Sequence, residues 1–189
     1  MSSTLAPFGF RPAYFPTGLD RAKKYTIASG FATAIFKNQP VILNTNGTIG
    51  NGSAAADLLG VFAGVEFVDA TGRPFVQNFW PAGQVVFAGT TPTAWVYDDP
   101  EIVYEVQADG PVLQAAVGDQ ADYTNVNTGS ALTGLSTATL ASVLAGVGVQ
   151  AQWRIVGFSQ ALDNVPGDAF TVVQVQLARS QLRANKVAV

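Results

Sequence analysis

The segment TAWVYDDPEIVYEVQADG, residues 93–110, constrains the fold of this chain more than any other stretch. Two runs rich in β-branched and aromatic residues flank the turn-forming sequence DDP. In the second run, apolar residues alternate with Glu105 and Gln107 in period two, which is the spacing of a β-strand with two different faces. The segment therefore predicts two strands joined by a tight turn.

Similar patterns recur along the chain, separated by Gly, Asn and Pro. Asn46-Gly47 predicts a hairpin within 40–50, and Gly60 and Gly64 are expected at bulges or close approaches. The other expected strand segments are 24–36, 58–69, 75–80, 83–89, 149–159 and the run from 168 that ends near 178. Many short strands with such turns predict a mainly β fold, an antiparallel β-sandwich or a small β-barrel, with at most one or two short helices.

Three regions are expected. Residues 1–23 hold three prolines and no periodicity, which predicts an extended N-terminal arm. Residues 24–178 form the β-rich body, with a polar loop at about 119–146 in which STATLASVLAG is expected to form one short helix. Residues 179–189 form a basic C-terminal tail, which we expect to leave the body and to become ordered only on contact with a neighbour.

The arm carries an unusual concentration of aromatic side chains. They are Phe8, Phe10, Tyr14 and Phe15, with Arg11 among them. Each aromatic ring can bury on the order of 150–250 Å², and a terminal segment stays ordered only when it is tied down. The arm therefore either runs along its own domain or docks on a partner.

Charge is distributed unevenly. Residues 1–37 hold five cations against Asp20 alone, the tail adds Arg179, Arg183 and Lys186, and the region between them holds twelve carboxylates against two arginines. This pattern argues against a nucleic-acid groove, and it fits basic ends that grip an acidic neighbour or a second copy. Alternatively, the termini are simply solvated.

The low charged fraction, 12%, is about half the usual share and indicates that much of the surface is buried against partners. A small, tightly packed monomer is the alternative. We expect no secretory signal and no membrane partner, because no segment has the required apolar length.

Several classes of chemistry lack their usual residues. The chain has no Cys and no His, so thiolate chemistry and the common general base are absent, and we expect no enzyme, no metal and no cofactor. The acidic run Asp98, Asp99, Glu101 and Glu105 suggests a catalytic carboxylate pair or a calcium site, but a turn at Asp98-Asp99-Pro100 explains the two aspartates more simply. Trp80, Trp95 and Trp153 are a conceivable sugar platform, but each lies in or at the end of a strand-like run, which favours core packing.

Read in order, PFGFRP, YTIASGFATAIFKNQPVIL, LLGVFAGVEFVDATGRP, NFWPAG, AWVYDDPEIVYEVQADG, GLSTATL, WRIVGF and DNVPGDAFTVVQVQL resemble a family of tailed-bacteriophage virion proteins, the capsid decoration or cement proteins. The resemblance spans nearly the whole chain, and VYDDPEIVYEVQADG is its most distinctive block.

The resemblance implies a non-enzymatic β-rich module on the capsid exterior, made in the bacterial host cytoplasm. Its expected partners are the major capsid protein and its own copies, as a trimer with exchanged N-terminal arms. On this interpretation the partner-binding residues are Phe8, Phe10, Arg11, Tyr14, Phe15, Arg179 and Arg183. A virion-surface glycan-binding module and a minor head or tail component are the alternatives.

Overall fold

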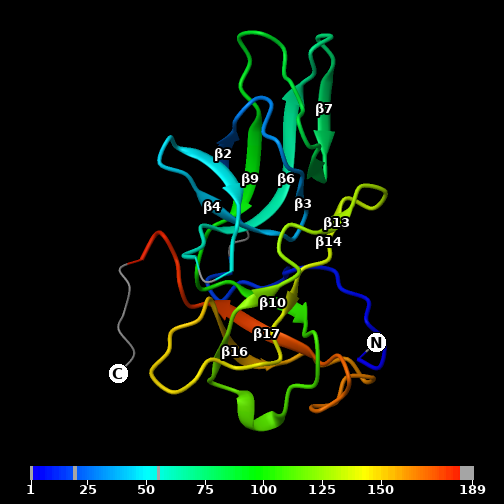
Figure 1. Cartoon of the computed structure of the whole chain (residues 1–189), viewed down its shortest axis with the longest axis vertical. Coiled ribbons are helices and arrows are strands. Elements are labelled where there is room, and N and C mark those ends of the chain that lie inside the picture. Colours follow the sequence, from blue (N-terminus) through cyan, green and yellow to red (C-terminus); the bar gives the residue numbers. More distant parts are fainter. Residues whose placement is uncertain (1, 19–20, 55, 184–189) are drawn as a thin grey trace.

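The structure, a computed structural model, describes residues 2–18, 21–54 and 56–183. It has two lobes stacked along the long axis of the molecule (Figure 1). Every regular element among the described residues is a β-strand except one short 3₁₀ helix, η1 (Gln114–Ala116). The predicted mainly β fold is confirmed. None of the described residues forms a helix that is long and apolar enough to span a bilayer.

The upper lobe is a small closed barrel. Its sheet has the order β4-β5-β2-β9-β6-β7, and an additional pairing of β4 with β6 closes the first five of these strands into a ring. The strands are β2 (Lys23–Ile27), β4 (Pro40–Leu43), β5 (Thr48–Asn51), β6 (Gly60–Val68), β7 (Pro74–Gln77) and β9 (Thr93–Tyr97). The inward side chains, among them Phe62, Phe67 and Trp80, form one buried cluster. The hairpin predicted at Asn46-Gly47 is the β4–β5 connection.

Two glycines in β6 allow the barrel to close. A Cβ on Gly60 would lie 2.0 Å from the carbonyl oxygen of Tyr97, so only glycine permits this approach of β6 to β9. The register between the two strands shifts between Phe62 and Gly64. The expected close approach and bulge are both confirmed.

The lower lobe is a five-stranded antiparallel sheet in the order β1-β10-β17-β16-β11. The strands are β1 (Arg11–Tyr14), β10 (Val103–Gln107), β11 (Gln120–Ala121), β16 (Trp153–Phe158) and β17 (Val172–Leu177). One face carries Tyr104, Ile155 and Val175 into a second buried cluster, which contains few residues of the barrel. The two runs on either side of DDP thus belong to different sheets, and the turn between them carries the chain from the barrel to the lower lobe.

The region from 119 to 146 is not a loop with a helix. It contains β12 (Tyr123–Thr124), β13 (Gly129–Ser130), β14 (Leu135–Ser136) and β15 (Thr139–Leu140), which pair as two small sheets. The expected helix in STATLASVLAG is therefore wrong. Thr139 and Ser136 are buried, and their hydroxyl groups hydrogen-bond to neighbouring segments, which favours the extended chain.

Two further short strands, β3 (Ile35–Phe36) and β8 (Phe79–Trp80), pair with each other. The strand expected at 83–89 is reduced to an isolated bridge between Val86 and Asp69.

The described part of the arm, residues 2–18, runs along its own chain. Gly9 has φ 72 and packs against Asn38, and the Phe10 amide donates a 2.8 Å hydrogen bond to the Asn38 carbonyl. From there the arm enters β1 at the edge of the sheet.

The start of the tail is held by the body. Ser180 is 3% exposed and forms a parallel bridge with Leu58. The Gln181 side chain accepts from the Leu43 amide and donates to its carbonyl, at 2.7 and 3.0 Å. The expectation that the chain leaves the body at residue 179 is wrong for 179–183, and residues 184–189 lie outside the described residues.

Candidate interaction surface

The outer face of the five-stranded sheet gathers polar side chains from strands that are far apart in the sequence. The register places Val103, Gln176, Arg154 and Gln120 in one row across β10, β17, β16 and β11. Because successive strand residues point to opposite faces, the residues opposite to the core in these strands include Arg154, Gln174 and Gln176 together with Val103. Arg154 is exposed and forms no ion pair with any described residue.

The arm adds a second row. Arg11 lies opposite Glu105 and binds its carboxylate at 2.7 Å, while its guanidinium lies 4.8 Å from the centre of the Phe8 ring. Burial raises the pKa of Glu105, but hydrogen bonds from Arg11, Ser159 and Gln174 together with the Arg11 charge outweigh it, so the pKa is lowered overall. Glu105 is therefore the ionised centre of this row.

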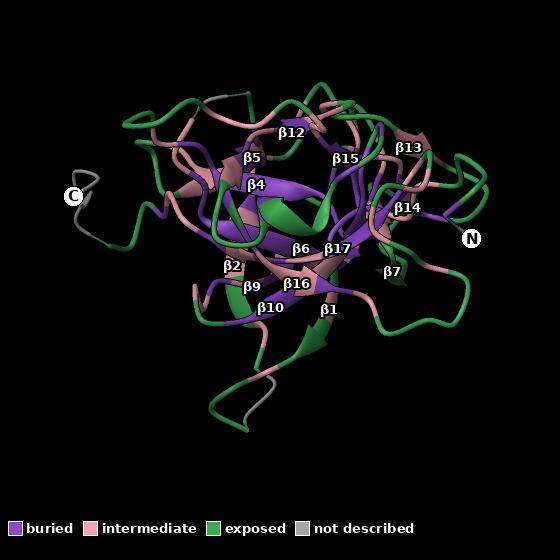
Figure 2. Ribbon diagram, turned by 90° about the horizontal axis from the view of Figure 1, so that it is seen from below, coloured by how far each residue is buried: buried purple, intermediate pink, exposed green. Residues whose placement is uncertain are grey.

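Tyr14, at the end of β1, is half exposed and lies opposite Val103. Val103 is 1% exposed but belongs to neither buried cluster, so it is covered on the outer face of the sheet. In Figure 2, which views the molecule from below, β1 is largely exposed, in contrast to the buried β10 beside it.

The tail reaches the same face. The Arg183 guanidinium pairs with the Glu101 carboxylate, and the Gln176 side-chain amide donates a 3.0 Å hydrogen bond to the Glu101 carbonyl. Both described chain ends thus meet on one sheet face. We call the set Arg11, Tyr14, Glu105, Arg154, Gln176 and Arg183 the arm–tail face.

The seven residues predicted to bind partners do not all lie on this face. Phe8, Arg11, Tyr14 and Arg183 lie on or beside it. Phe15 is half-buried, packs against the lower core and lies 5.9 Å from Tyr97 between ring centres.

Phe10 and Arg179 both contact the body of their own chain. Phe10 is fully buried and stacks on Trp153 with ring centroids 4.3 Å apart, so it is a core residue of its own chain in this structure. Arg179 is half-buried and binds Asp57 through Nε and Nη2, at 2.8 and 2.7 Å, so it fastens the tail to the body.

Arg154, Gln174 and Gln176 were not assigned to a site from the sequence. Their alternation with Ile155, Val173 and Val175 was visible, and it marks them as the outer residues of two strands. Only the pairing of β1 with β10 shows that they share a face with the arm.

The candidate carboxylate pair has a structural explanation. Asp98 is 2% exposed, and its Oδ2 accepts from Lys23 Nζ at 2.9 Å and from the Tyr25 hydroxyl at 2.7 Å. The Asp99 side chain accepts from the Glu101 amide at 2.9 Å, which is an Asx turn. Asp98 thereby ties the start of β2 to the crossover between the lobes. No group of three or more potential metal ligands occurs among the described residues.

The three tryptophans separate into two environments. Trp80 and Trp153 are fully buried, so the core interpretation is confirmed for both. Trp95 is half-buried on the barrel wall, and Lys24 Nζ lies 4.9 Å from its ring centre. A stacked cation therefore covers the one tryptophan that could offer a ring to a sugar.

No family model, curated protein or solved structure matches this chain.

Proposed function

We propose that the protein is a non-enzymatic structural component of a tailed-phage virion, which binds the outer surface of the capsid and cements neighbouring capsid subunits. Its partner is the major capsid protein, and its location is the capsid exterior. The proposal rests on the sequence resemblance and on one geometric observation, the meeting of the arm and the tail on the arm–tail face.

The chemistry of the arm–tail face suits a protein partner with carboxylates. Arg11, Arg154 and Arg183 stand there against Glu101 and Glu105, whereas the remainder of the body is strongly acidic. Arginine and tyrosine dominate binding energies at protein interfaces, because they bury large planar surfaces and donate several hydrogen bonds. Many copies on one shell add avidity to each modest contact.

The test is co-sedimentation of the full-length protein with undecorated shells of its own phage. Arg154→Ala and Tyr14→Ala should each weaken binding about tenfold or more, since truncated interface anchors cost upward of about 1.4 kcal/mol. Arg73→Ala is the matched control, because Arg73 is exposed at the far end of the barrel lobe and is the other arginine of the acidic body.

Deletion of residues 1–16 is a weaker test, because it also removes Phe10 from the lower core. Failure of the wild-type protein to pellet, or equal pelleting of Arg154→Ala, Tyr14→Ala and Arg73→Ala, would overturn capsid binding through this face.

We further propose that the protein is a trimer whose copies exchange arms. The β1–β10 pairing and the Phe10 pocket would be the same whether the arm comes from its own chain or from a neighbour, which is the condition for exchange. The chain has no cysteine, so Arg11→Cys with Glu105→Cys gives a clean cross-linking pair. Covalent trimers on a non-reducing gel are expected, whereas cross-linked monomers alone would refute exchange.

A further inference from the structure

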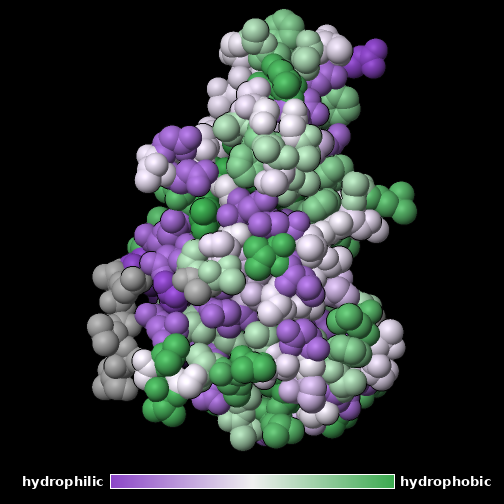
Figure 3. Space-filling model, in the orientation of Figure 1, coloured by the Kyte–Doolittle hydropathy of each residue, from purple (hydrophilic) through white to green (hydrophobic). Residues whose placement is uncertain are grey.

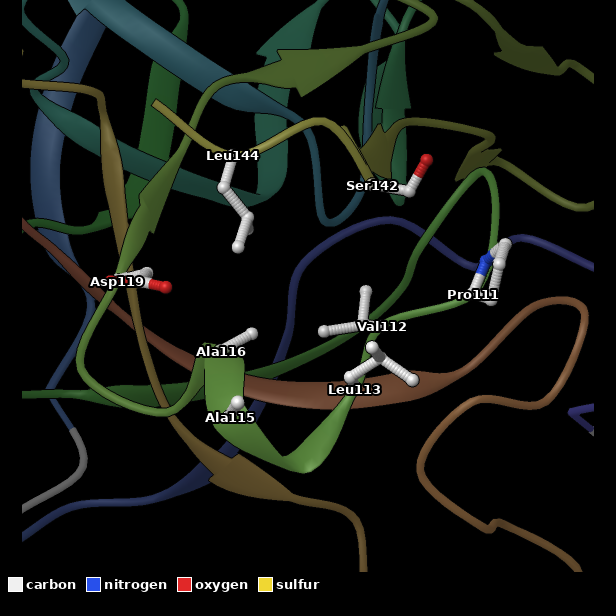
Figure 4. A pocket seen from close by; sticks show the side chains of 8 residues that line it. All are labelled: Pro111, Val112, Leu113, Ala115, Ala116, Asp119, Ser142 and Leu144. Atoms are coloured by element: carbon white, nitrogen blue, oxygen red, sulfur yellow. The ribbon is translucent and has the colours of Figure 1, made fainter. Parts of the chain in front are cut away.

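A pocket at the lower end of the molecule is not part of the arm–tail face. It has a volume of about 240 Å³ and lies between η1, the segment before it, and the segment that follows β15. Figure 4 shows the side chains of Val112, Leu113, Ala116 and Leu144 around a common space, with Asp119 at the side. The lining is thus mainly aliphatic, with one carboxylate.

The surroundings of the pocket are also apolar. Leu113 lines the pocket and is 65% exposed, and Val143, between the lining residues Ser142 and Leu144, is 82% exposed. In Figure 3 hydrophobic side chains recur over the lower end of the molecule. Single exposed aliphatic residues are ordinary, but a group of them around an open pocket indicates a docking surface.

The segments around the pocket at the lower end of the molecule carry negative charge only. The segments 109–119, 142–150 and 160–168 contain four aspartates and no Lys or Arg. Asp119 lines the pocket, is exposed and forms no ion pair with any described residue. A ligand that complements this surface carries small aliphatic side chains next to a cation.

The C-terminal sequence ANKVAV, residues 184–189, has this chemistry. Lys186 is followed by Val187 and Val189, and no acid occurs after Asp168. The other basic segment of the chain is already engaged, because Lys23 pairs with Asp98 and Lys24 lies over Trp95.

The distance between Arg183 and the pocket favours a C-terminal segment from another copy over the chain's own. Arg183 pairs with Glu101, two residues before Val103, whereas Asp119 precedes Gln120, which lies in the same row of the sheet as Val103 but three strands away. Neighbouring strands lie about 4.8 Å apart, so this row spans about 14 Å, whereas the three residues from Arg183 to Lys186 advance at most about 11 Å.

We propose that this pocket binds residues 184–189 of a second copy of the chain, with a valine side chain in the aliphatic space and Lys186 beside Asp119. Such a contact joins two different surfaces, so it propagates from copy to copy and closes into a ring where the rotation permits. It does not rest on capsid binding or on arm exchange.

The first test measures binding of a labelled peptide with the sequence QLRANKVAV, residues 181–189. The receptor is the full-length chain with Val187→Asp, whose own C-terminal segment should not compete. Saturable binding is expected, and addition of Ala115→Lys to the receptor should weaken it about tenfold or more, by filling an exposed position of the lining and repelling Lys186. Ala88→Lys is the matched control, at an exposed alanine of the barrel lobe. Binding should also weaken with added salt.

Asp119→Asn provides a second variant in case Ala115→Lys lowers the folded fraction. Absence of saturable binding, or equal loss with Ala88→Lys, would overturn the assignment of the pocket.

The second test separates a neighbour's segment from the chain's own. Chains with Ala115→Lys keep a functional C-terminal segment, and chains with Val187→Asp keep a functional pocket. Sedimentation velocity should show a new complex when the two variants are mixed and none when Ala115→Lys is combined with Val187→Asp in every chain. Peptide binding without a new complex in the mixture would mean that the segment docks on its own chain, and would refute the second-copy contact.

Discussion

The two lobes differ in how they treat the edges of their β-sheets. The barrel is built from residues 23–97, and the pairing of β4 with β6 leaves its five-stranded ring without a free edge. The lower sheet draws β1 from one end of the chain and β17 from near the other, and β1 and β11 are its edges. Closure makes the barrel self-sufficient, whereas the lower sheet depends on terminal segments that can also contact neighbours.

The same contrast holds for the cores. The barrel cluster consists of residues from the barrel segment itself. The lower cluster needs Phe10, which stacks on Trp153 and meets Tyr123 edge-on at 6.0 Å. Bringing Phe10 to Trp153 closes a very long loop, so we expect the lower lobe to form later in folding.

The largest expected effect comes from Phe10→Ala. Truncating a fully buried Phe should lower the free energy of unfolding by about 3–5 kcal/mol. Hydrogen exchange should rise in β10, β16 and β17 and much less in the barrel. Phe62→Ala, a fully buried residue of the barrel, should cost a similar amount with the opposite distribution. Unchanged protection of β10 in Phe10→Ala would contradict the dependence of the lower lobe on the arm.

Gly60→Ala tests the closure of the barrel. The added Cβ would collide with the Tyr97 carbonyl, so β6 and β9 must separate, at a cost of about 1–3 kcal/mol. Gly146→Ala is the control, because a Cβ there meets nothing within 4 Å, and it should be neutral or stabilising by about 0.4–1 kcal/mol. Chemical denaturation of both variants measures the difference, and equal midpoints would show that the close approach does not constrain the barrel.

Substitution of one tyrosine in each lobe compares their contributions to stability at neutral pH. Tyr25→Phe removes the hydrogen bond to Asp98 and should cost about 1 kcal/mol. Tyr123→Phe removes a buried hydroxyl that has no hydrogen-bond partner, and should be neutral or stabilising. Thermal unfolding at pH 7 measures the sign of the stability change in each variant. A loss of stability in Tyr123→Phe equal to that in Tyr25→Phe would contradict the assigned environments.

Tyr25 and Tyr123 also predict how the stability of the chain changes at alkaline pH. Burial raises the pKa of Tyr123, and burial together with the hydrogen bond and charge of Asp98 raises the pKa of Tyr25. Above pH about 10 the unfolded chain loses these protons while the folded chain keeps them, so stability falls as the pH rises. Each Phe variant should flatten this decline, as measured by denaturation between neutral and alkaline pH.

The smallest effect concerns the arm. The pKa of Glu105 is lowered in the folded chain, so its contribution is present above the ordinary carboxyl pKa and is lost as the pH falls through the folded value. Glu105→Gln should reduce the pH dependence of hydrogen-exchange protection in β1 by less than about 1 kcal/mol. The effect is small because Arg11 is largely exposed, so solvent screens its ion pair with Glu105. Exchange of the β1 amides at several acidic pH values measures it. Glu66→Gln, on the barrel wall, should leave β1 unchanged.

The sequence predicted the strands well, because local alternation and turn residues determine them. The hairpin at Asn46-Gly47 and the close approach at Gly60 followed from single residues. The closure of β4 on β6 and the division of 93–110 between two sheets could not be predicted, since both depend on which distant strands pair.

The candidate surface was predictable only in part. Arg11, Tyr14 and Arg183 were singled out one by one, but their shared face depends on the pairing of β1 with β10 and on the Arg183–Glu101 contact. For Phe10, composition identifies an aromatic side chain that must be buried, but it does not identify the surface that buries it.

The direct pairing of Tyr14 with Val103 has a consequence for the modular construction of the chain. The polypeptide leaves the lower lobe after Tyr14 and re-enters it at Val103, at neighbouring positions of adjacent strands, and the whole barrel lies between these two points. Its ends are therefore as close as the ends of a hairpin loop, about 5 Å apart. Among the described residues of the barrel segment, Leu58 and Val61 belong to the buried lower core. The barrel is thus an insertion between two adjacent strands of the lower sheet, and it also holds the arm through the Phe10–Asn38 hydrogen bond and the tail through the Arg179–Asp57 ion pair.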